Sequence, residues 1–358
     1  MAYTTIDDGS AHFQIALYTG NDSTNAITNN GNSDMQPDFL WTKNRSSSAD
    51  HKLFDSTRGV IKFIESNTAD TEGTQANLLS SFNSDGFTLG AGGEVNSSST
   101  NYVAWQWKAG GGSGNRTTFT ETGDNPGGGY QANTTAGFSI VDYVGTGDNG
   151  ATVSHGLGAV PHWILFKNRD TAQTWVVYHH KNTAAPETDI LQLEATNATY
   201  DSNTYFNDTA PTSSVFSLGT SNDLNKDDDN IIAYVWTEIQ GFSKFGRYTG
   251  NGNADGPFVY TGFKPRYLMI KRTNNTEHWK VNDTVRDTNT QYGNDASLHP
   301  NQNIAETTSS SLNVDFLGNG FKLVTADGAS NAVDAPFVYM CFAEHPFVSS
   351  KGVPCTAR

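Results

Sequence analysis

Short apolar runs separated by turn-forming clusters make up nearly the whole chain. Runs of four to eight residues rich in Tyr, Val, Ile, Phe and Trp alternate with clusters of Gly, Asn, Asp and Ser. The periodicity of an amphipathic helix is hard to find, and the pattern is instead typical of strands joined by turns. We therefore predict an all-β fold.

One apolar pattern occurs three times along the chain. The segment PDFLWTKNR at 37–45 returns as PHWILFKNR at 161–169 and as PRYLMIKRT at 265–273, at offsets of 124 and 104 residues. Four further landmarks follow similar offsets in the same order, including YTG, YVG and YTG near the start of each copy. Five landmarks in one order indicate three tandem copies of a single structural unit.

The copies divide the chain into a first unit at 1–108, a second unit at 137–240 and a third unit at 241–347, followed by a tail at 348–358. About seven short strands in about 105 residues fit a β-sandwich or jelly roll, so we predict three tandem repeats of that kind. The segment at 109–136 is rich in Gly, Thr and Asn, which predicts a linker that is flexible or extended on a surface. We expect the second and third units to sit in a fixed relation and the first unit to move more freely.

The aromatic strand near the end of each unit has two interpretations. Trp105 and Trp107 invite a sugar-binding hypothesis, because an exposed aromatic plane can stack on a pyranose ring. In a strand, however, they share one face with Val103, and the matching face is apolar or aromatic in every unit. The equivalent residues are Ile232, Tyr234 and Trp236, then Val338, Met340 and Phe342. The opposite face is also mostly apolar, so we predict a strand buried on both faces, with Trp107, Trp236 and Phe342 as equivalent core residues.

Composition and charge exclude several classes of partner. The chain of 358 residues carries 22 Lys and Arg against 37 Asp and Glu, a formal net charge of −15. Nucleic acid and anionic membrane surfaces are bound by clustered Lys and Arg, so we expect neither as a partner. No apolar stretch approaches 18 residues and no secretory signal is recognised, so we expect a soluble protein without membrane insertion. The only cysteines, Cys341 and Cys355, predict no disulfide framework.

A lysine recurs near the end of the most regular repeated strand. It follows an aromatic residue by four positions in each unit, at Lys43, Lys167 and Lys271. A recurring lysine could contact an acidic ligand. The interpretation that we favour is a strand-end charge that pairs with a nearby carboxylate, such as Asp55 in the first unit or Asp283 in the third.

The sequence contains no recognisable catalytic or zinc-binding motif. HExxH, CxxC and Gly-x-Ser-x-Gly are all absent, so we expect no enzyme, no catalytic residues and no cofactor. The acidic cluster at 222–230 leaves a calcium hypothesis open, because Asp227, Asp228 and Asp229 carry the oxygen ligands that a hard cation prefers. The cluster lacks the spacing and the terminal Glu of an EF-hand loop, and the alternative is a solvated hairpin loop.

Longer phrases resemble a family of repeat-containing virion structural proteins encoded by marine tailed bacteriophages. The similarity covers essentially the whole chain and is carried by FSIVDYVGTGDNGATVSHGLGAVPHWILFKNR, FSKFGRYTGNGNADGPFVYTGFKPRYLMIKR, NGFKL and CFAEHPF. Some members of that family resemble tail fibres. The resemblance implies a virion protein made in the host cytoplasm, and it implies no reaction and no site residues.

Two classes of function fit this setting. The one that we favour is a tail-fibre or tip-type adhesin, which binds a host surface polysaccharide or receptor without catalysis. The alternative is a capsid or tail decoration or assembly protein, and a depolymerase comes third. We expect other virion proteins as partners and a homo-oligomer. The candidate ligand contacts are the aromatic residues Tyr205, Phe206 and Trp279, with core packing as their alternative.

Overall fold

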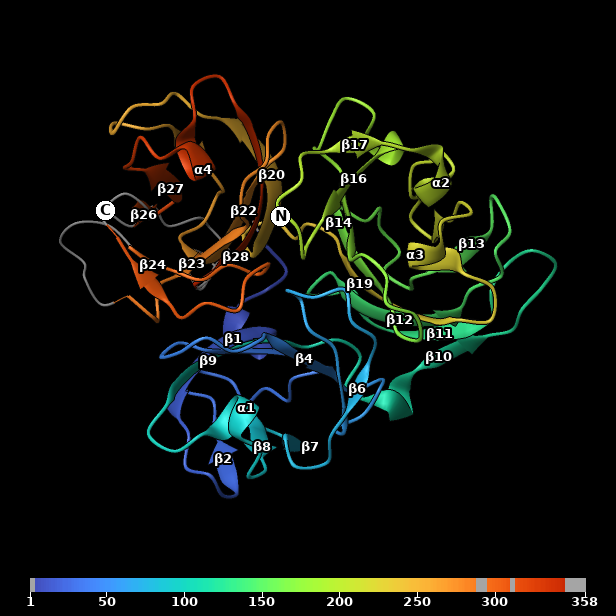
Figure 1. Cartoon of the computed structure of the whole chain (residues 1–358), viewed down its shortest axis with the longest axis horizontal. Helices are drawn as coiled ribbons and strands as arrows, with labels where there is room; N and C mark the ends of the chain where they lie inside the picture. Colours follow the sequence, from blue (N-terminus) through green and yellow to red (C-terminus); the bar gives the residue numbers. More distant parts are fainter. Residues whose placement is uncertain (1–3, 288–294, 310–312, 345–358) are drawn as a thin grey trace.

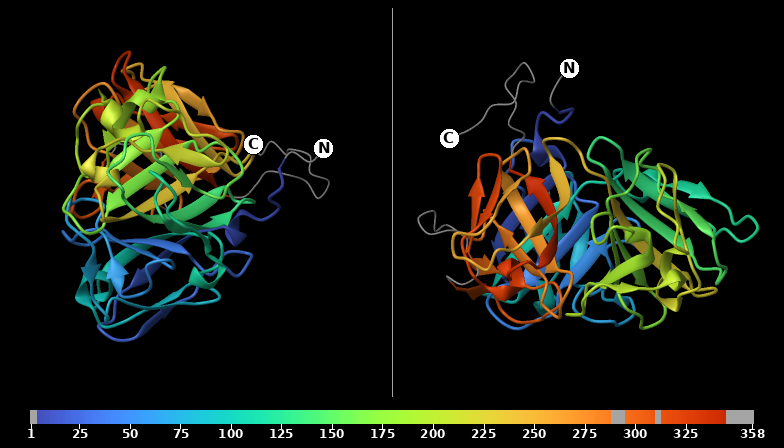
Figure 2. Two further views of the ribbon diagram at one scale, coloured as in Figure 1. Left: turned by 90° about the vertical axis from the view of Figure 1, so that its right-hand side faces the viewer. Right: turned by 90° about the horizontal axis from the view of Figure 1, so that it is seen from above.

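The computed structural model describes residues 4–287, 295–309 and 313–344, and it is built almost entirely from antiparallel strands. Three lobes surround a common centre (Figure 1), and they stay packed together in two perpendicular views (Figure 2). The all-β prediction is confirmed. Within the described part, no helix is long and apolar enough to cross a membrane. The predicted tail at 348–358 and Cys355 lie outside the described residues.

The first lobe combines a large and a small sheet. The large sheet has the order β1 (Phe13–Thr19), β9 (Asn101–Trp107), β3 (Phe39–Asn44) and β4 (Lys52–Asp55). The small sheet has the order β2 (Asn25–Ile27), β8 (Phe87–Leu89) and β7 (Leu79–Phe82). The remaining elements are η1 (Gly9–Ala11), β5 (Lys62–Phe63), β6 (Gly73–Thr74) and α1 (Gly93–Asn96).

The second lobe has a longer sheet. Its order is β10 (Thr117–Phe119), β11 (Gly128–Asn133), β12 (Phe138–Val144), β19 (Asn230–Trp236), β14 (Trp163–Asn168), β15 (Val176–His179), β16 (Asp189–Gln192) and β17 (Tyr200–Asp201). A small sheet pairs β13 (Thr152–Ser154) with β18 (Val215–Ser217). The helical turns are η2 (Ser113–Asn115), η3 (Pro186–Thr188), α2 (Asn203–Phe206) and α3 (Asn222–Asn225).

The third lobe repeats the plan of the first. Its large sheet has the order β20 (Ser243–Thr249), β28 (Pro336–Ala343), β22 (Pro265–Arg272) and β23 (Lys280–Asp283). Its small sheet has the order β21 (Phe258–Tyr260), β27 (Gly320–Leu323) and β26 (Val314–Leu317). The other elements are β24 (Ala296–Ser297), β25 (Thr307–Thr308) and α4 (Gly328–Asn331). In all three lobes the last strand of the unit therefore lies between the first strand and the predicted repeated strand.

A tyrosine near the end of the first strand explains the YTG and YVG landmarks. The hydroxyls of Tyr18, Tyr143 and Tyr248 donate to backbone carbonyls of the helical turn that precedes the last strand, at 2.9, 2.7 and 2.6 Å. Each hydroxyl thereby satisfies a carbonyl that the single-turn helix leaves without a partner. The repeated tyrosine therefore caps the same helical turn in each lobe.

Each large sheet is covered on both faces. In the first lobe, Leu40 and Ala104 pack with Phe87 of the small sheet in one apolar cluster. Trp105 and Trp107 point the other way, into a central cluster that all three lobes share. Both indole rings are buried, so the sugar-stacking hypothesis for these two residues is wrong.

The equivalent residues Trp107, Trp236 and Phe342 meet at the centre. The ring of Trp107 lies 6.1 Å from that of Trp236 and 5.7 Å from that of Phe342. Their exposed fractions are 2%, 1% and 0%, which confirms the prediction that they are buried core equivalents. The large sheets therefore share one hydrophobic core instead of each facing solvent.

Part of the predicted linker at 109–136 is extended and joins the large sheet of the second lobe. Residues 117–119 and 128–133 form β10 and β11, and β11 pairs with β12 along the edge of the second lobe. The Gln131 side chain also donates to Ser56 of the first lobe at 2.9 Å. Backbone pairing needs no apolar side chains, which is why composition indicated a flexible or surface-extended linker and did not predict that its strands join the sheet. Together with the shared core, these contacts pack the first lobe against the others.

The lobes also bind one another in a cyclic pattern. Lys43, Lys167 and Lys271 are buried, and each ammonium donates to a backbone carbonyl of a neighbouring lobe. The acceptors are the carbonyls of Asn303, Ala69 and Thr196, at 3.2, 2.9 and 3.2 Å. The predicted carboxylate pairs with Asp55 and Asp283 are therefore not formed, because these lysines point across lobe boundaries. Desolvation lowers the pKa of each lysine to about 8.

A buried charge network connects the first lobe to the second. The Asp55 carboxylate accepts from Arg58 Nε at 2.5 Å and from the Tyr234 hydroxyl of the second lobe at 2.7 Å. Glu72 of the first lobe accepts from Arg169 of the second at 2.8 Å. All the charges in this network have a partner of opposite sign, as burial requires.

The same network recurs between the third lobe and the first. Asp283 accepts from Arg286 Nε at 2.5 Å and from Trp105 Nε1 of the first lobe at 3.0 Å. Glu306 of the third lobe accepts from Arg45 of the first at 2.7 Å. Two of the three lobe boundaries thus carry a buried Asp–Arg pair within one lobe and a Glu–Arg pair that joins this lobe to its neighbour.

The boundary between the second and third lobes lacks all of these charges. His179 pairs with Trp163 in the sheet, as Asp55 does with Phe39, so it replaces the aspartate. Three residues later, Asn182 replaces the arginine. Thr199 donates its backbone N–H to the Thr273 carbonyl, in the place of the Glu–Arg pair. The three-fold pattern is therefore broken at this boundary.

Candidate binding groove

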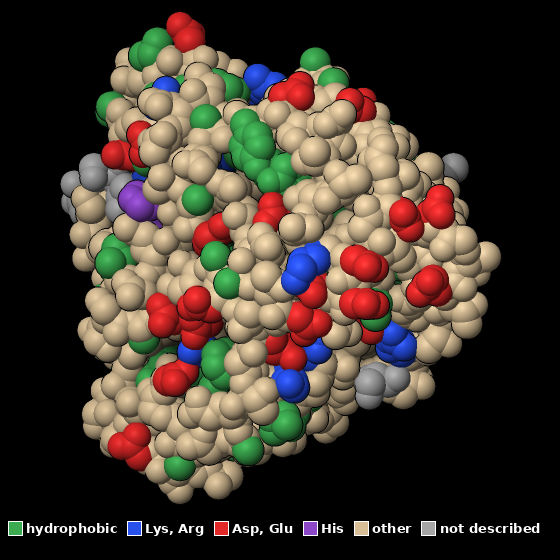
Figure 3. Space-filling view, turned by 45° about the vertical axis from the view of Figure 1, so that its right-hand side comes forward, with side chains coloured by type: hydrophobic (Ala, Val, Ile, Leu, Met, Phe, Trp, Pro, Cys, Tyr) green, Lys and Arg blue, Asp and Glu red, His purple; other side chains and the backbone are tan. Residues whose placement is uncertain are grey.

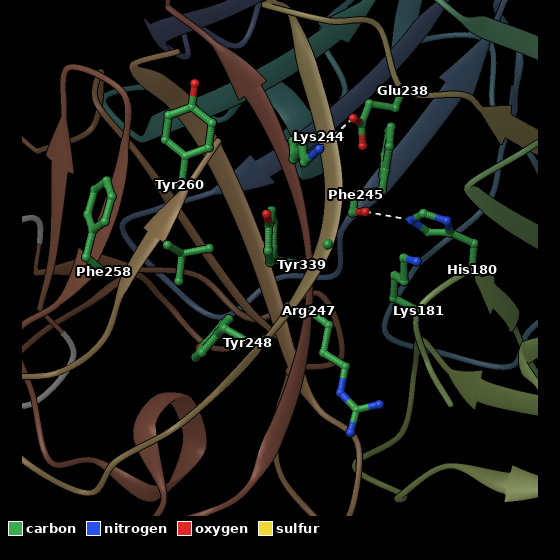
Figure 4. Close-up of a pocket in the computed structure, with 12 residues that line it drawn as sticks. His180, Lys181, Glu238, Lys244, Phe245, Arg247, Tyr248, Phe258, Tyr260 and Tyr339 are labelled. Atoms are coloured by element: carbon green, nitrogen blue, oxygen red, sulfur yellow. Dashed lines mark hydrogen bonds and ion pairs between the residues drawn. The ribbon is translucent and has the colours of Figure 1, made fainter. Parts of the chain in front are cut away.

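A groove of about 470 Å³ lies at the boundary where the charge network is missing. Its walls come from β20, β21 and Tyr339 of β28 in the third lobe, and from His180, Lys181 and Glu238 in the second (Figure 4). β20 is the edge strand of its large sheet. The equivalent edge strand of the second lobe, β12, is covered by β11. In the described part of the third lobe no strand takes the place of β11 beside β20, and the groove lies there.

One wall of the groove displays aromatic rings to solvent. Along β21, the side chains of Phe258 and Tyr260 alternate with buried Val259, as expected for a strand with one face against the core. Phe258 is 47% exposed and Tyr260 is 61% exposed. Large apolar rings usually lie inside a fold, so two neighbouring exposed rings make this groove the candidate ligand surface.

The groove holds more positive than negative side chains. Lys244 pairs with Glu238 at 2.6 Å, which neutralises the one carboxylate among its lining residues. Lys181 and Arg247 are exposed, and neither has an ion-pair partner within the described residues. Asp and Glu are scattered over the face shown in Figure 3, in keeping with the net charge of −15. A groove with three cations against one carboxylate differs from the rest of the chain.

One histidine lines the groove from the second lobe and contacts a second histidine behind it. His180 Nε2 lies 2.7 Å from the carbonyl oxygen of Phe245 in β20, and its ring lies 4.3 Å from that of His162. Because His180 bonds to a carbonyl, its Nε2 carries the proton and donates. Burial lowers the pKa of both imidazoles to about 4, so they are neutral at pH 7. His180, the one of the two that lines the groove, therefore adds no charge to it.

The calcium hypothesis finds no preformed cage. Asp229 accepts from Thr171 at 2.6 Å, from Asn168 at 2.8 Å and from Lys226 at 3.2 Å, so its carboxylate already has protein donors. Asp227 and Asp228 are exposed in the turn before β19. No three His, Cys, Asp or Glu side chains in the described ranges come together as a metal site. The segment joins the single-turn helix α3 to β19.

The aromatic ligand candidates chosen from the sequence do not line the groove. Trp279 is 0% exposed, and its Nε1 donates to the carbonyl of Gln192 at 2.8 Å across a lobe boundary. Tyr205 and Phe206 are buried in the core of the second lobe. None of the three presents a ring to solvent, so they are packing residues. Sequence reasoning missed Phe258 and Tyr260, whose alternation with Val259 is the one pattern that could have indicated them.

A family model described as a domain of unknown function, DUF7483, matches residues 8–346. The chain belongs to this family. Because the match runs through all three lobes, the DUF7483 domain corresponds to the whole three-lobed structure and not to one repeat. No curated protein and no solved structure matches the chain.

Proposed function

We propose that this protein is a virion surface protein, a tail-fibre or tip-type adhesin that binds a host surface saccharide without catalysis. The observation that carries the proposal is the groove between the second and third lobes, with Phe258 and Tyr260 exposed in its wall. Aromatic rings stack on the apolar faces of sugars, and convergent polar groups fix the orientation of the ligand. The virion setting rests on the resemblance to phage structural proteins described above.

The groove supports binding more than hydrolysis. A glycosidase uses two carboxylates that flank the bond to be cleaved, usually about 5–10 Å apart. Glu238 is the only carboxylate among the residues that line this groove, and Lys244 holds it in an ion pair. A depolymerase is therefore the less favoured function at this site.

Purified full-length protein should bind susceptible host cells and polysaccharide extracted from their surface. Several copies on a virion would raise a modest affinity per site through avidity. The matched pair of variants is Tyr260→Ala in the groove and Tyr200→Ala outside it, since Tyr200 is also partly exposed. Only Tyr260→Ala should lose binding. Release of reducing sugar ends would indicate an enzyme, and burial of the groove against other virion proteins in particle density would favour the decoration role.

A further inference from the structure

Tyr339 is an unusual residue in the wall of the groove. It is 2% exposed, and its hydroxyl has no hydrogen-bond partner within the described part of the chain. Figure 4 shows the side chain in the space between Tyr260 and the strand that carries Phe245. The hydroxyl oxygen itself is not fully buried, so solvent reaches it from the groove that Tyr339 lines. The groove therefore offers a ligand a polar contact that the protein itself leaves unused.

The internal repeats show that this tyrosine is specific to the third lobe. Tyr339 lies opposite Gly246 in the sheet, where the first lobe pairs Ala104 with Ala16. The second lobe also has alanine at the equivalent of Tyr339. A Cβ on Gly246 would lie only 2.4 Å from the Tyr339 hydroxyl oxygen, so the glycine makes room for the ring. Gly246 and Tyr339 both differ from the residues at the equivalent positions of the other lobes, and together they place a phenol ring in this wall.

The groove also contains two cations, Lys181 and Arg247, that form no ion pair within the described residues. Figure 4 places Lys181 on the side of the second lobe and Arg247 on β20, with the aromatic residues Phe258 and Tyr260 at the opposite side. A guanidinium recognises carboxylate or sulfate through paired N–H donors, and an ammonium does so as a point charge. In a chain of net charge −15, unpaired cations beside exposed rings favour a ligand that combines a stacking face with a negative group.

An extended peptide fits this groove less well. Strand addition requires free backbone groups along the edge of β20. The carbonyl of Phe245, near the middle of that edge, already accepts from His180 at 2.7 Å. A long polyanion such as nucleic acid would meet the acidic remainder of the surface. A short saccharide segment meets neither obstacle.

We propose that the groove binds an acidic saccharide. A sugar ring stacks on Tyr260 and Phe258, a sugar hydroxyl bonds to Tyr339, and the carboxylate or sulfate pairs with Arg247 and Lys181. This assignment rests on the proposed saccharide-binding function and adds the charge class of the ligand and the residues that select it.

The test uses the full-length protein on a panel of uronate, sialylated and sulfated oligosaccharides, each beside its methyl-esterified or desulfated form. Every acidic glycan that binds should bind about tenfold more tightly than its neutral form. Arg247→Ala and Lys181→Ala should each remove most of that preference, while Lys108→Ala, a charge loss in the first lobe, should leave it unchanged. Tyr339→Phe should weaken binding about threefold to tenfold without lowering the melting temperature, because the lost hydroxyl has no protein partner.

The outcomes distinguish failure of the acidic-saccharide assignment from failure of the proposed saccharide-binding function. Equal affinity for acidic and neutral forms, or an unchanged preference in Arg247→Ala and Lys181→Ala, overturns the acidic assignment and leaves saccharide binding standing. Tighter binding of an oligothymidylate or of an extended peptide than of any glycan also overturns it. If neither host cells nor any glycan binds, the proposed function itself fails. Failure of Tyr339→Phe to change affinity removes the hydroxyl contact and contradicts the assignment of that wall.

Discussion

The buried Asp55 network predicts that single substitutions at a lobe boundary destabilise the whole chain. Asp55→Ala removes the acceptor of Arg58 Nε and of the Tyr234 hydroxyl. The Arg58 side chain is 0% exposed, so its charge stays out of water. It keeps two acceptors, the Glu72 carboxylate at 3.3 Å and the Leu53 carbonyl at 3.0 Å.

These remaining contacts set the expected magnitude. Removing one partner of a buried ion pair costs about 3–5 kcal/mol, and the two surviving acceptors place Asp55→Ala near the lower end of that range. The buried Tyr234 hydroxyl also loses the acceptor of its proton, although its oxygen still accepts from Arg58 at 3.2 Å. We expect the free energy of unfolding to fall by about 3 kcal/mol.

Guanidinium denaturation followed by tryptophan fluorescence measures this change. The matched control is Asp142→Ala, which breaks the Arg116–Asp142 pair at 2.6 Å, where both side chains are 23% exposed. A solvent-exposed pair contributes about 0–1 kcal/mol. Equal losses in the two variants would refute the argument that burial determines the value of the Asp55 network. A loss confined to the first lobe, seen as a separate transition, would refute the shared core.

Three further outcomes are expected. Trp236→Ala should lower the free energy of unfolding by about 3–5 kcal/mol, and an unchanged melting temperature would contradict its core position. Since folding lowers the pKa of His162 and His180 from 6.5 to about 4, the unfolded chain binds more protons, and stability should fall in a urea titration as pH drops from 6.5 to 4. The three buried lysines, with pKa lowered from 10.5 to about 8, should make stability rise between pH 8 and 10, and a flat profile would contradict this.

Local patterns in the sequence predicted the strands and the core but not the contacts between lobes. The repeated segments form β3, β14 and β22, and the strand predicted to be buried on both faces is buried on both faces. The acceptor of Lys43 is a carbonyl at Asn303, 260 residues away, and no periodicity encodes such a pairing. The pairing of β11 with β12 was missed for a related reason, because it depends on backbone groups that every sequence carries.

The candidate groove was only partly accessible to sequence reasoning. Alignment of the three units already places His179 against two aspartates and Tyr339 against two alanines. These two differences from the repeat could have indicated the groove from the sequence. Tyr339 lines the groove, and His179 lies at the boundary between the second and third lobes. What the alignment could not supply was the adjacency of the second and third lobes, which brings Lys181 to the side of β20.

Because the three units are joined in one chain, one lobe boundary can differ in sequence from the other two. In a symmetric homotrimer every boundary is identical, so a substitution that opens a groove weakens all three interfaces at once. In this chain the cyclic lysine contacts and the aromatic centre are kept at every boundary, and two boundaries keep the Asp–Arg network. The boundary between the second and third lobes can therefore carry neutral histidines and an unpaired edge strand in place of the charged pairs. The cyclic contacts among the three lobes are kept. Structural redundancy at two boundaries leaves the third free to diverge, and the proposed binding groove lies at that third boundary.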